Sequence, residues 1–403
     1  MRDPALRAVA IAAFIYFLDG LIHSLLGPLA PELARDLELG NADLGPVFSA
    51  NLIGQCIGLV TFPVIARRTG QRLSIILAVA GFGAFQCASA LAEGATSLFA
   101  LRLATGIFLG GCLPGCLAVV TELAPPKRRG VAIMALFTGY GLGATIAGIV
   151  AGGFANTGGW RAAMLAVGAV SLVTAWAAWL WLREPSRLEG GDAETAPGDK
   201  LAELRLLSPP YLPGTLMLWL LFVGMLTISY CLNSWLPIML TEVGRDETYA
   251  ALSVSIFSFG GVVAALCIGL LIDRIGAMRV LIVFTVCAAV SLFLIGLAME
   301  AAPKAVLTPL LAAAGFFSLG AYGGVNVVLA SFYPDSLRAA GIGWAKSVGR
   351  VGTVIAPVLI GIGLTAGMRE TLIMSLFAVP ALAATLSLVT IARSSRWKSR
   401  ESV

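Results

Sequence analysis

The sequence predicts an all-α polytopic membrane protein with twelve transmembrane helices. Of its residues, 58% are hydrophobic and 12% are charged, about half the charged fraction of soluble domains. Apolar runs of roughly 20 residues recur, each long enough to cross a hydrocarbon core. Only helices and closed barrels satisfy their backbone groups in lipid. The predicted spans are 6–28, 42–65, 74–92, 97–121, 131–154, 160–182, 213–240, 249–272, 279–299, 306–332, 340–365 and 371–392.

The first run follows a short basic segment, MRDPALR, as the apolar part of a signal peptide would. It is longer than such a segment, and no clear small-residue cleavage site follows it. We therefore interpret it as the first transmembrane span.

The distribution of Lys and Arg predicts the orientation. Nineteen of the 27 fall in loops and tails on the side of the N-terminus, five fall on the opposite side, and three lie inside spans. This asymmetry predicts that both termini are cytoplasmic. It also accounts for the net charge of +5, so we expect no nucleic-acid partner.

Other function classes lack their signatures. The seven cysteines all lie in apolar runs and show no metal-ligand pattern, as expected for small core residues. The chain has no G-x-x-x-x-G-K-[ST] sequence, and therefore no P-loop for ATP-driven pumping. We expect no metal site and no cofactor other than protons as the coupling ion, and we expect no enzymatic activity.

A single long polar stretch divides the chain into two halves. We predict a six-helix bundle over 1–183, a cytoplasmic linker over 184–210 and a second six-helix bundle over 211–403. The halves echo each other: PVIARRTGQR (63–72) joins spans two and three, and GLLIDRIGAMR (269–279) joins spans eight and nine. Parallel six-span repeats are typical of transporters that bind substrate between the repeats near the bilayer midplane.

At these residues the chain resembles the major facilitator superfamily. The string Gly-x-Leu-x-Asp-Arg-x-Gly (269–276) is similar to its loop signature, and Arg102-Leu-Ala-Thr-Gly106 is similar to its fourth-span element. Further strings resemble the aromatic acid:proton symporters, close to the hydroxyphenylpropionate and hydroxybenzoate carriers. These strings are LDG (18–20), LGPVFSANLIG (44–54), TELAPPKRRG (121–130), NSWLP (233–237), FYPDSLRAAGIGWA (332–345) and VGRVG (348–352).

The likeness covers nearly the whole chain and implies the major facilitator fold, with two pseudo-symmetric bundles. The sequence departs from the family pattern at three positions. Ile22, followed by His23, stands where a second acid is typical of the first span. Arg67 stands where the loop signature has Asp, and Lys346 stands at a position that is usually apolar.

Charged residues inside spans indicate function because they are costly in lipid. Lys346 and Arg350 are four residues apart on one helix face, where like charges repel. Two such cations indicate an anionic substrate, and the guanidinium of Arg350 matches a carboxylate in two places. Alternatively, Lys346 extends to the membrane interface.

Asp19, His23 and Arg102 are the candidates for proton coupling. At 1.5 Å rise per residue, Asp19 and Arg102 differ in depth by about 6 Å, so we expect them to pair. The pair is either a structural neutralisation or a coupling element in which Asp19 takes up a proton when Arg102 turns to the substrate. His23 lies one turn from Asp19 and is either a proton entry point or a packing residue.

Further polar residues are candidates for the pocket and the gates. We predict that aromatic and amide groups bind a planar, hydroxylated ring, although each is equally compatible with packing, and Trp235 with an interfacial anchor. These residues are Tyr140, Tyr230, Asn233, Trp235, Tyr322 and Asn326. For the gates we predict a salt bridge of Glu122 with the basic segment 127–129. Asp273 with Arg274 is predicted to belong to the matching gate between spans eight and eleven, in contact with Arg338, and we include Arg67 and Arg68. Glycines four residues apart in spans four and five predict close helix packing.

The sequence thus predicts a multi-pass protein of the bacterial cytoplasmic membrane, expected to be a monomer. It would import a small, aromatic organic anion with protons by alternating access. Two alternatives remain open: a proton-coupled exporter of drugs or metabolites, and a carrier of non-aromatic organic anions. A membrane sensor or scaffold that does not transport is not favoured, because we expect no sizeable soluble output domain.

Overall fold

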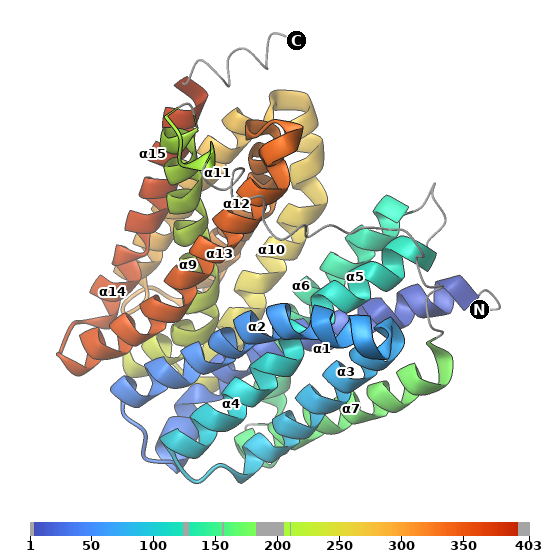
Figure 1. Ribbon diagram of the computed structural model, residues 1–403. Coiled ribbons are helices and arrows are strands. Elements are labelled where there is room, and N and C mark those ends of the chain that lie inside the picture. The colour runs from blue at the N-terminus through green and yellow to red at the C-terminus, as the bar shows by residue number, and fades with distance from the viewer. Residues whose placement is uncertain (1–3, 124–128, 155–156, 183–204, 210, 394–403) are drawn as a thin grey trace. The chain divides into compact units, whose positions relative to one another are not determined.

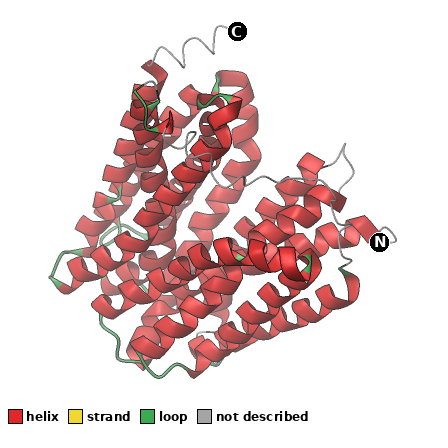
Figure 2. Cartoon of the chain, in the orientation of Figure 1, coloured by secondary structure: helices red, strands yellow, loops and turns green. Residues whose placement is uncertain are grey.

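The described residues form long helices, many of them joined by short turns. The computed structural model describes residues 4–123, 129–154, 157–182, 205–209 and 211–393, and these contain helices and turns but no strand (Figure 2). The helices are α1 (Pro4–Asp36), α2 (Asn41–Thr69), α3 (Gln71–Ala88), η1 (Ser89–Leu91), α4 (Ala95–Gly110), α5 (Cys112–Leu123), α6 (Arg129–Phe154), α7 (Gly159–Trp181), α9 (Leu212–Glu242), α10 (Glu247–Ile275), α11 (Ala277–Ala298), α12 (Lys304–Phe332), α13 (Asp335–Thr365), α14 (Glu370–Leu376) and α15 (Ala378–Arg393) (Figure 1).

The twelve predicted spans are confirmed. Among the described residues, 12 helical stretches are long and apolar enough to cross a membrane, from Arg7–Asp36 to Glu370–Arg393. The fourth span consists of α4 and α5, which meet at Gly111, and the last consists of α14 and α15, which meet at Phe377. The cytoplasmic placement of both termini stays a prediction.

Contacts between residues group the chain into two compact units. Unit 1 contains 1–187, 233–258 and 357–368, and unit 2 contains 188–232, 259–356 and 369–403. Unit 1 therefore combines α1 to α7 with one end each of α9, α10 and α13. The division into 1–183 and 211–403 stays a prediction, and most of the linker predicted over 184–210 lies outside the described residues.

The internal repeat is visible in the backbone of two turns. Gly70 separates α2 from α3 with φ +89°, and Gly276 separates α10 from α11 with φ +93°. Each glycine N–H donates to the carbonyl four residues earlier, at 2.9 Å. Each glycine carbonyl accepts the N–H four residues later, at 3.2 Å. Only glycine adopts this left-handed conformation without strain, which explains why both loops of the repeat carry it.

Some neighbouring helices of unit 1 pack so closely that their backbones are in direct contact. A Cβ on Gly106 of α4 would lie 2.1 Å from the carbonyl oxygen of Asn51 on α2. A Cβ on Gly143 of α6 would lie 2.0 Å from the carbonyl oxygen of Phe17 on α1. Both distances are far below van der Waals contact, so these crossings require glycine. The close packing predicted for the glycines of spans four and five is confirmed at these positions.

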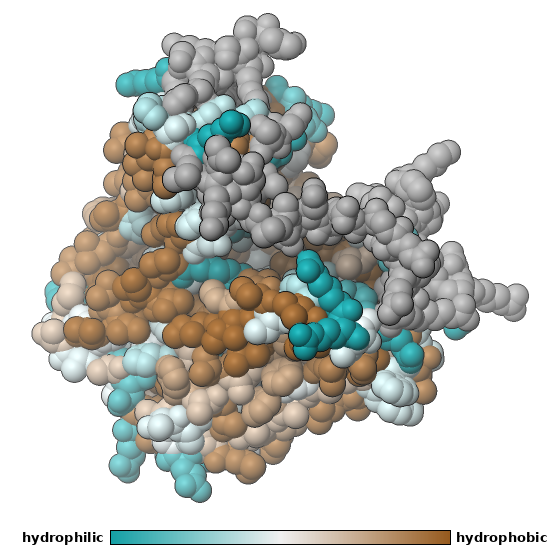
Figure 3. Space-filling view, in the orientation of Figure 1, coloured by the Kyte–Doolittle hydropathy of each residue, from teal (hydrophilic) through white to brown (hydrophobic). Residues whose placement is uncertain are grey.

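Apolar side chains cover much of the face visible in Figure 3. On α7, Trp176, Trp179 and Trp181 are exposed, and the guanidinium of Arg72 lies 5.2 Å from the ring centroid of Trp179. Aromatic and basic residues of this kind anchor helices at the membrane interface. The exposed apolar surface is therefore the surface expected to face lipid.

The α1–α6 crossing yields a matched pair of variants on one helix. We expect Gly143→Ala to lower the thermal midpoint, since its methyl group would push α6 off α1 and overpacking costs about 1–3 kcal/mol. Gly153→Ala serves as the control because a Cβ there has no heavy atom within 4 Å. The measurement is thermal unfolding of the purified protein in detergent. Equal midpoints for the two variants would contradict the close approach.

Candidate substrate and proton sites

His23, the only histidine in the chain, lies in a cluster of polar side chains in unit 1. Two amides of α2 reach its Nδ1 atom: Nε2 of Gln55 at 2.9 Å and Nδ2 of Asn51 at 3.3 Å. The ring centroid of Tyr140 on α6 lies 6.3 Å from that of His23. We call these four residues the histidine cluster. Of the predicted residues, it brings together His23 and Tyr140; the two amides were not predicted.

The two amides define the protonation state that fits this arrangement. An amide NH₂ group donates hydrogen bonds and accepts none, so Nδ1 of His23 must offer its lone pair. With the amides in this orientation, the arrangement fits a neutral imidazole that carries its proton on Nε2. Asn51 and Gln55 are 5% and 9% exposed, so their donors have little competing water.

Asp19 lies one helical turn from His23 and is also buried, with 6% of its surface exposed. It is close enough to Cys112 and Cys116 of α5 to interact with them electrostatically. A carboxyl group at such depth is costly when charged. Its location is compatible with the predicted proton role, which stays a prediction.

Arg102 is held by neutral groups of its own bundle, contrary to the predicted pair with Asp19. Its Nη2 donates to Oε1 of Gln86 and to Oγ of Ser89, both at 2.7 Å. Within the described part of the chain, Asp19 is not among its hydrogen-bond partners. The predicted pair is not formed in this structure, and Arg102 donates instead to acceptors on α3 and η1. With 1% of its surface exposed, Arg102 ties α3, η1 and α4 together.

A second cluster, in unit 2, contains the predicted anion ligands. Tyr322 of α12 lies within electrostatic range of Tyr230 on α9 and Arg350 on α13. Lys346 interacts with Arg350 one turn away on the same helix. We call these four residues the basic cluster. It combines two cations with two phenols, the donor groups that suit a carboxylate and ring hydroxyls.

The remaining predicted pocket residues have local partners. Nδ2 of Asn326 donates to the carbonyl groups of Tyr322 and Gly323 on its own helix, at 3.2 and 3.1 Å. Asn233 accepts a hydrogen bond from Ser258 at 3.5 Å. Trp235 is fully buried and packs edge-on against Phe48 at 5.3 Å. Trp235 therefore acts as a packing residue of unit 1 rather than as an interfacial anchor.

The predicted gating residues lie near the ends of their helices. Arg67 and Arg68 are exposed at the end of α2, and Asp273 and Arg274 are exposed at the end of α10. Glu122 and Arg338 are half-buried. Residues 124–128, next to Glu122, lie outside the described ranges. The gating role of all six residues stays a prediction.

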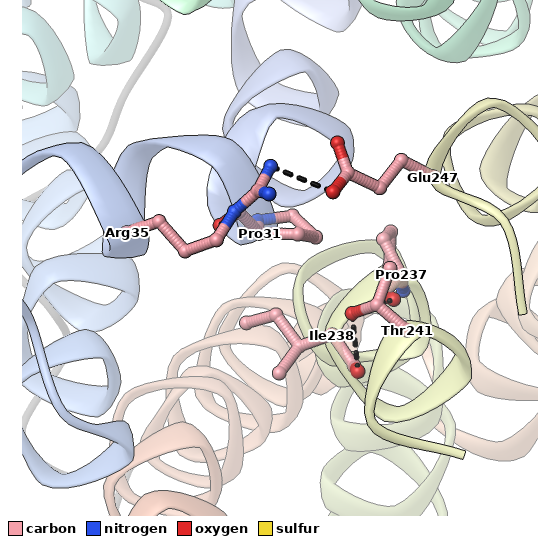
Figure 4. A network of polar contacts seen from close by, with 6 residues as sticks. All are labelled: Pro31, Arg35, Pro237, Ile238, Thr241 and Glu247. Carbon is pink, nitrogen blue, oxygen red and sulfur yellow. Dashed lines mark hydrogen bonds and ion pairs between the residues drawn. The ribbon is translucent and has the colours of Figure 1, made fainter. Parts of the chain in front are cut away.

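Unit 1 contains a polar network that was not predicted, at the end of α1 farthest from the N-terminus. Nη2 of Arg35 lies 2.6 Å from Oε1 of Glu247, the first residue of α10, while its Nε donates to the carbonyl of Pro31 (Figure 4). Nearby, Nδ2 of Asn41 donates to Oε1 of Glu242 at 2.9 Å. These contacts join α1 and α2 to the ends of α9 and α10.

Comparison with known proteins identifies the family. Residues 12–357 and 218–402 match the Major Facilitator Superfamily. The chain belongs to this superfamily. A gallate transporter of Pseudomonas putida is 30% identical over 94% of this chain and 90% of its own length. A 4-hydroxybenzoate transporter of Pseudomonas aeruginosa is 31% identical over 89% of this chain and 86% of its own.

Solved structures support the same fold. The crystal structure of a D-xylose–proton symporter superposes with a TM-score of 0.77, at 16% identity and covering 96% of each chain. The predicted major facilitator fold and the resemblance to aromatic acid carriers are confirmed. Because the curated relatives are transporters, the chain is assigned as a multi-pass transporter of this superfamily and not as an enzyme.

The partners of Arg102 predict a stability effect. We expect Gln86→Leu to lower the thermal midpoint, because loss of a hydrogen-bond acceptor for a buried charge costs about 1–3 kcal/mol. Gln86→Glu retains an acceptor and should be tolerated. The double variant Gln86→Leu, Arg102→Met should lose less than the sum of the single losses. Strict additivity in thermal unfolding would contradict the contact.

Proposed function

We propose that this protein imports a small aromatic carboxylate together with protons across the bacterial cytoplasmic membrane by alternating access. The observation that carries the proposal is the basic cluster of unit 2, which combines Arg350 and Lys346 with Tyr230 and Tyr322. The relatives named for gallate and 4-hydroxybenzoate support an aromatic acid as the cargo.

Arg350 is the proposed carboxylate ligand. Its guanidinium can donate two parallel hydrogen bonds to one carboxylate, which fixes the orientation as well as the charge. Lys346 on the same face adds a second positive charge. An anion bound here relieves the repulsion between the two cations, so the cluster favours a negatively charged substrate over a neutral one.

The two phenols of the basic cluster are the proposed contacts for the substrate ring. A tyrosine offers an aromatic face to the ring and a hydroxyl group to its substituents. Apolar surroundings with a few polar groups are typical of small-molecule sites. Phe222, whose ring lies 6.4 Å from that of Tyr322, supports one wall of this surface.

Asp19 and His23 are the proposed proton carriers. The import of an anion against a negative-inside potential is opposed by about 2.3 kcal/mol per charge at 100 mV. One co-transported proton cancels this cost, and further protons drive accumulation. A buried carboxyl and an imidazole one turn apart provide groups that can bind protons inside the membrane.

The carboxylate assignment is tested by uptake of labelled 4-hydroxybenzoate into proteoliposomes with an imposed pH gradient. We expect Arg350→Ala to reduce uptake at least about 100-fold, corresponding to the loss of a charge-assisted contact of roughly 2.7 kcal/mol or more. Arg369→Ala is the control because Arg369 is exposed and pairs with Glu300. Normal uptake by the Arg350 variant would contradict the assignment.

The coupling role of Asp19 is tested separately with Asn, which is similar in size and does not titrate. We expect Asp19→Asn to lose accumulation driven by a pH gradient while retaining exchange of internal for external substrate, since exchange requires no net proton movement. Unaltered accumulation by this variant would exclude Asp19 as the proton carrier.

A further inference from the structure

We propose that Asn51 acts as a switchable partner of His23: its amide donates to the neutral imidazole, and its carbonyl oxygen accepts from the protonated one. Asn51 and Gln55 would then be positioning residues that set when the only histidine of this chain carries a proton. Only the expected effect on transport rests on the proposed proton coupling.

The first observation is that only one end of the Asn51 carboxamide has a hydrogen-bond partner. Its Nδ2 lies 3.3 Å from Nδ1 of His23, yet its Oδ1 is a buried atom with no hydrogen-bond partner in the described structure. A buried acceptor without a donor costs free energy. A half-turn about the Cβ–Cγ bond exchanges the two ends of the carboxamide and brings this oxygen to His23.

The second observation is that the backbone of Asn51 has little freedom to move away. Gly106 of α4 packs directly on the carbonyl oxygen of Asn51: a Cβ on Gly106 would lie 2.1 Å from that oxygen. The side chain of Asn51 therefore extends toward α1 from a backbone position that is held in place. Gln55, one turn along α2, donates to the same nitrogen at 2.9 Å. A histidine that served only for packing would need one hydrogen-bond donor at this nitrogen, whereas His23 has two.

The proton balance is simple. The lone pair of Nδ1 takes a proton from water, and the ring becomes an imidazolium with both nitrogens protonated. The carboxamide of Asn51 turns, and its Oδ1 accepts the new Nδ1–H. On release the proton returns to water and the amide turns back. In its present orientation the amide of Gln55 stabilises only the neutral ring, whereas the carboxamide of Asn51, whose Oδ1 has no hydrogen-bond partner among the described residues, can turn and stabilise either state.

Other titratable groups also face this histidine. Asp19 lies one turn away on α1, and when it is ionised its negative charge favours the imidazolium. From α6 the ring of Tyr140 approaches to 6.3 Å. From α5 the thiols of Cys112 and Cys116 lie near Asp19. The amides of α2 lie within hydrogen-bond distance of the ring nitrogen Nδ1, so they are the side chains to vary.

Solid-state ¹⁵N NMR tests the proposal on the full chain in lipid bilayers. With ¹⁵N-labelled histidine and a purification tag free of histidine, His23 gives the only imidazole signals. At high pH we expect an unprotonated Nδ1 and a protonated Nε2. A neutral ring protonated on Nδ1 would overturn the inference.

Two variants of Asn51 should move the titration in opposite directions. Asn51→Asp offers only acceptors, so the ring should become charged at a pH about one unit higher than in the parent protein. Asn51→Leu removes the acceptor and should shift the transition about one unit lower. Thr61→Val, on the same helix, is the control and should leave the signals unchanged. Identical titrations for the Asp and Leu variants would overturn the inference.

A transport assay on the same variants separates this inference from the proposed function. If His23 is a coupling group, Asn51→Asp should lose gradient-driven accumulation and retain exchange. Shifted NMR titrations with normal accumulation would uphold the role of Asn51 and contradict coupling through His23. Unshifted titrations with lost accumulation would overturn the role of Asn51 and leave the proposed function standing.

Discussion

Polar groups at hydrocarbon depth in this protein depend on partners within the protein, since lipid offers none. This constraint forces the backbone into helices. It also determines the surroundings of the buried side chains. Arg102 is satisfied by Gln86 and Ser89, and His23 is satisfied by Asn51 and Gln55. In both cases these hydrogen-bond partners are neutral side chains.

The glycines make these polar contacts possible. Without a side chain at Gly106, α2 and α4 come close enough for Asn51 to be held at a defined position. Without one at Gly143, α6 lies directly on α1 next to Asp19 and His23. Close approach of helices therefore does two things here: it replaces the hydrophobic driving force that is absent in lipid, and it sets the hydrogen-bond geometry of the buried polar groups.

The fold could be predicted from the sequence because hydropathy and chain length limit the choices so strongly. The repeat could also be predicted, because Gly70 and Gly276 meet the same backbone requirement in both halves. The partner of Arg102 could not be predicted in this way. Helical rise gives the depth of a residue but not the direction of its side chain, and in the structure the side chain of Arg102 is directed to Gln86 and Ser89. The amides around His23 were missed because Asn and Gln are unremarkable in an apolar run, and only the packing of α2 against α1 reveals them.

The central claim is that anion and proton cross together, and direct measurement of proton movement tests it best. Proteoliposomes loaded with a pH-sensitive dye, at equal pH inside and outside, receive external 4-hydroxybenzoate at a pH where the acid is almost fully ionised. The account predicts acidification of the interior in time with substrate entry, and no such change with the Arg350→Ala protein. Substrate entry without any accompanying proton movement would contradict it.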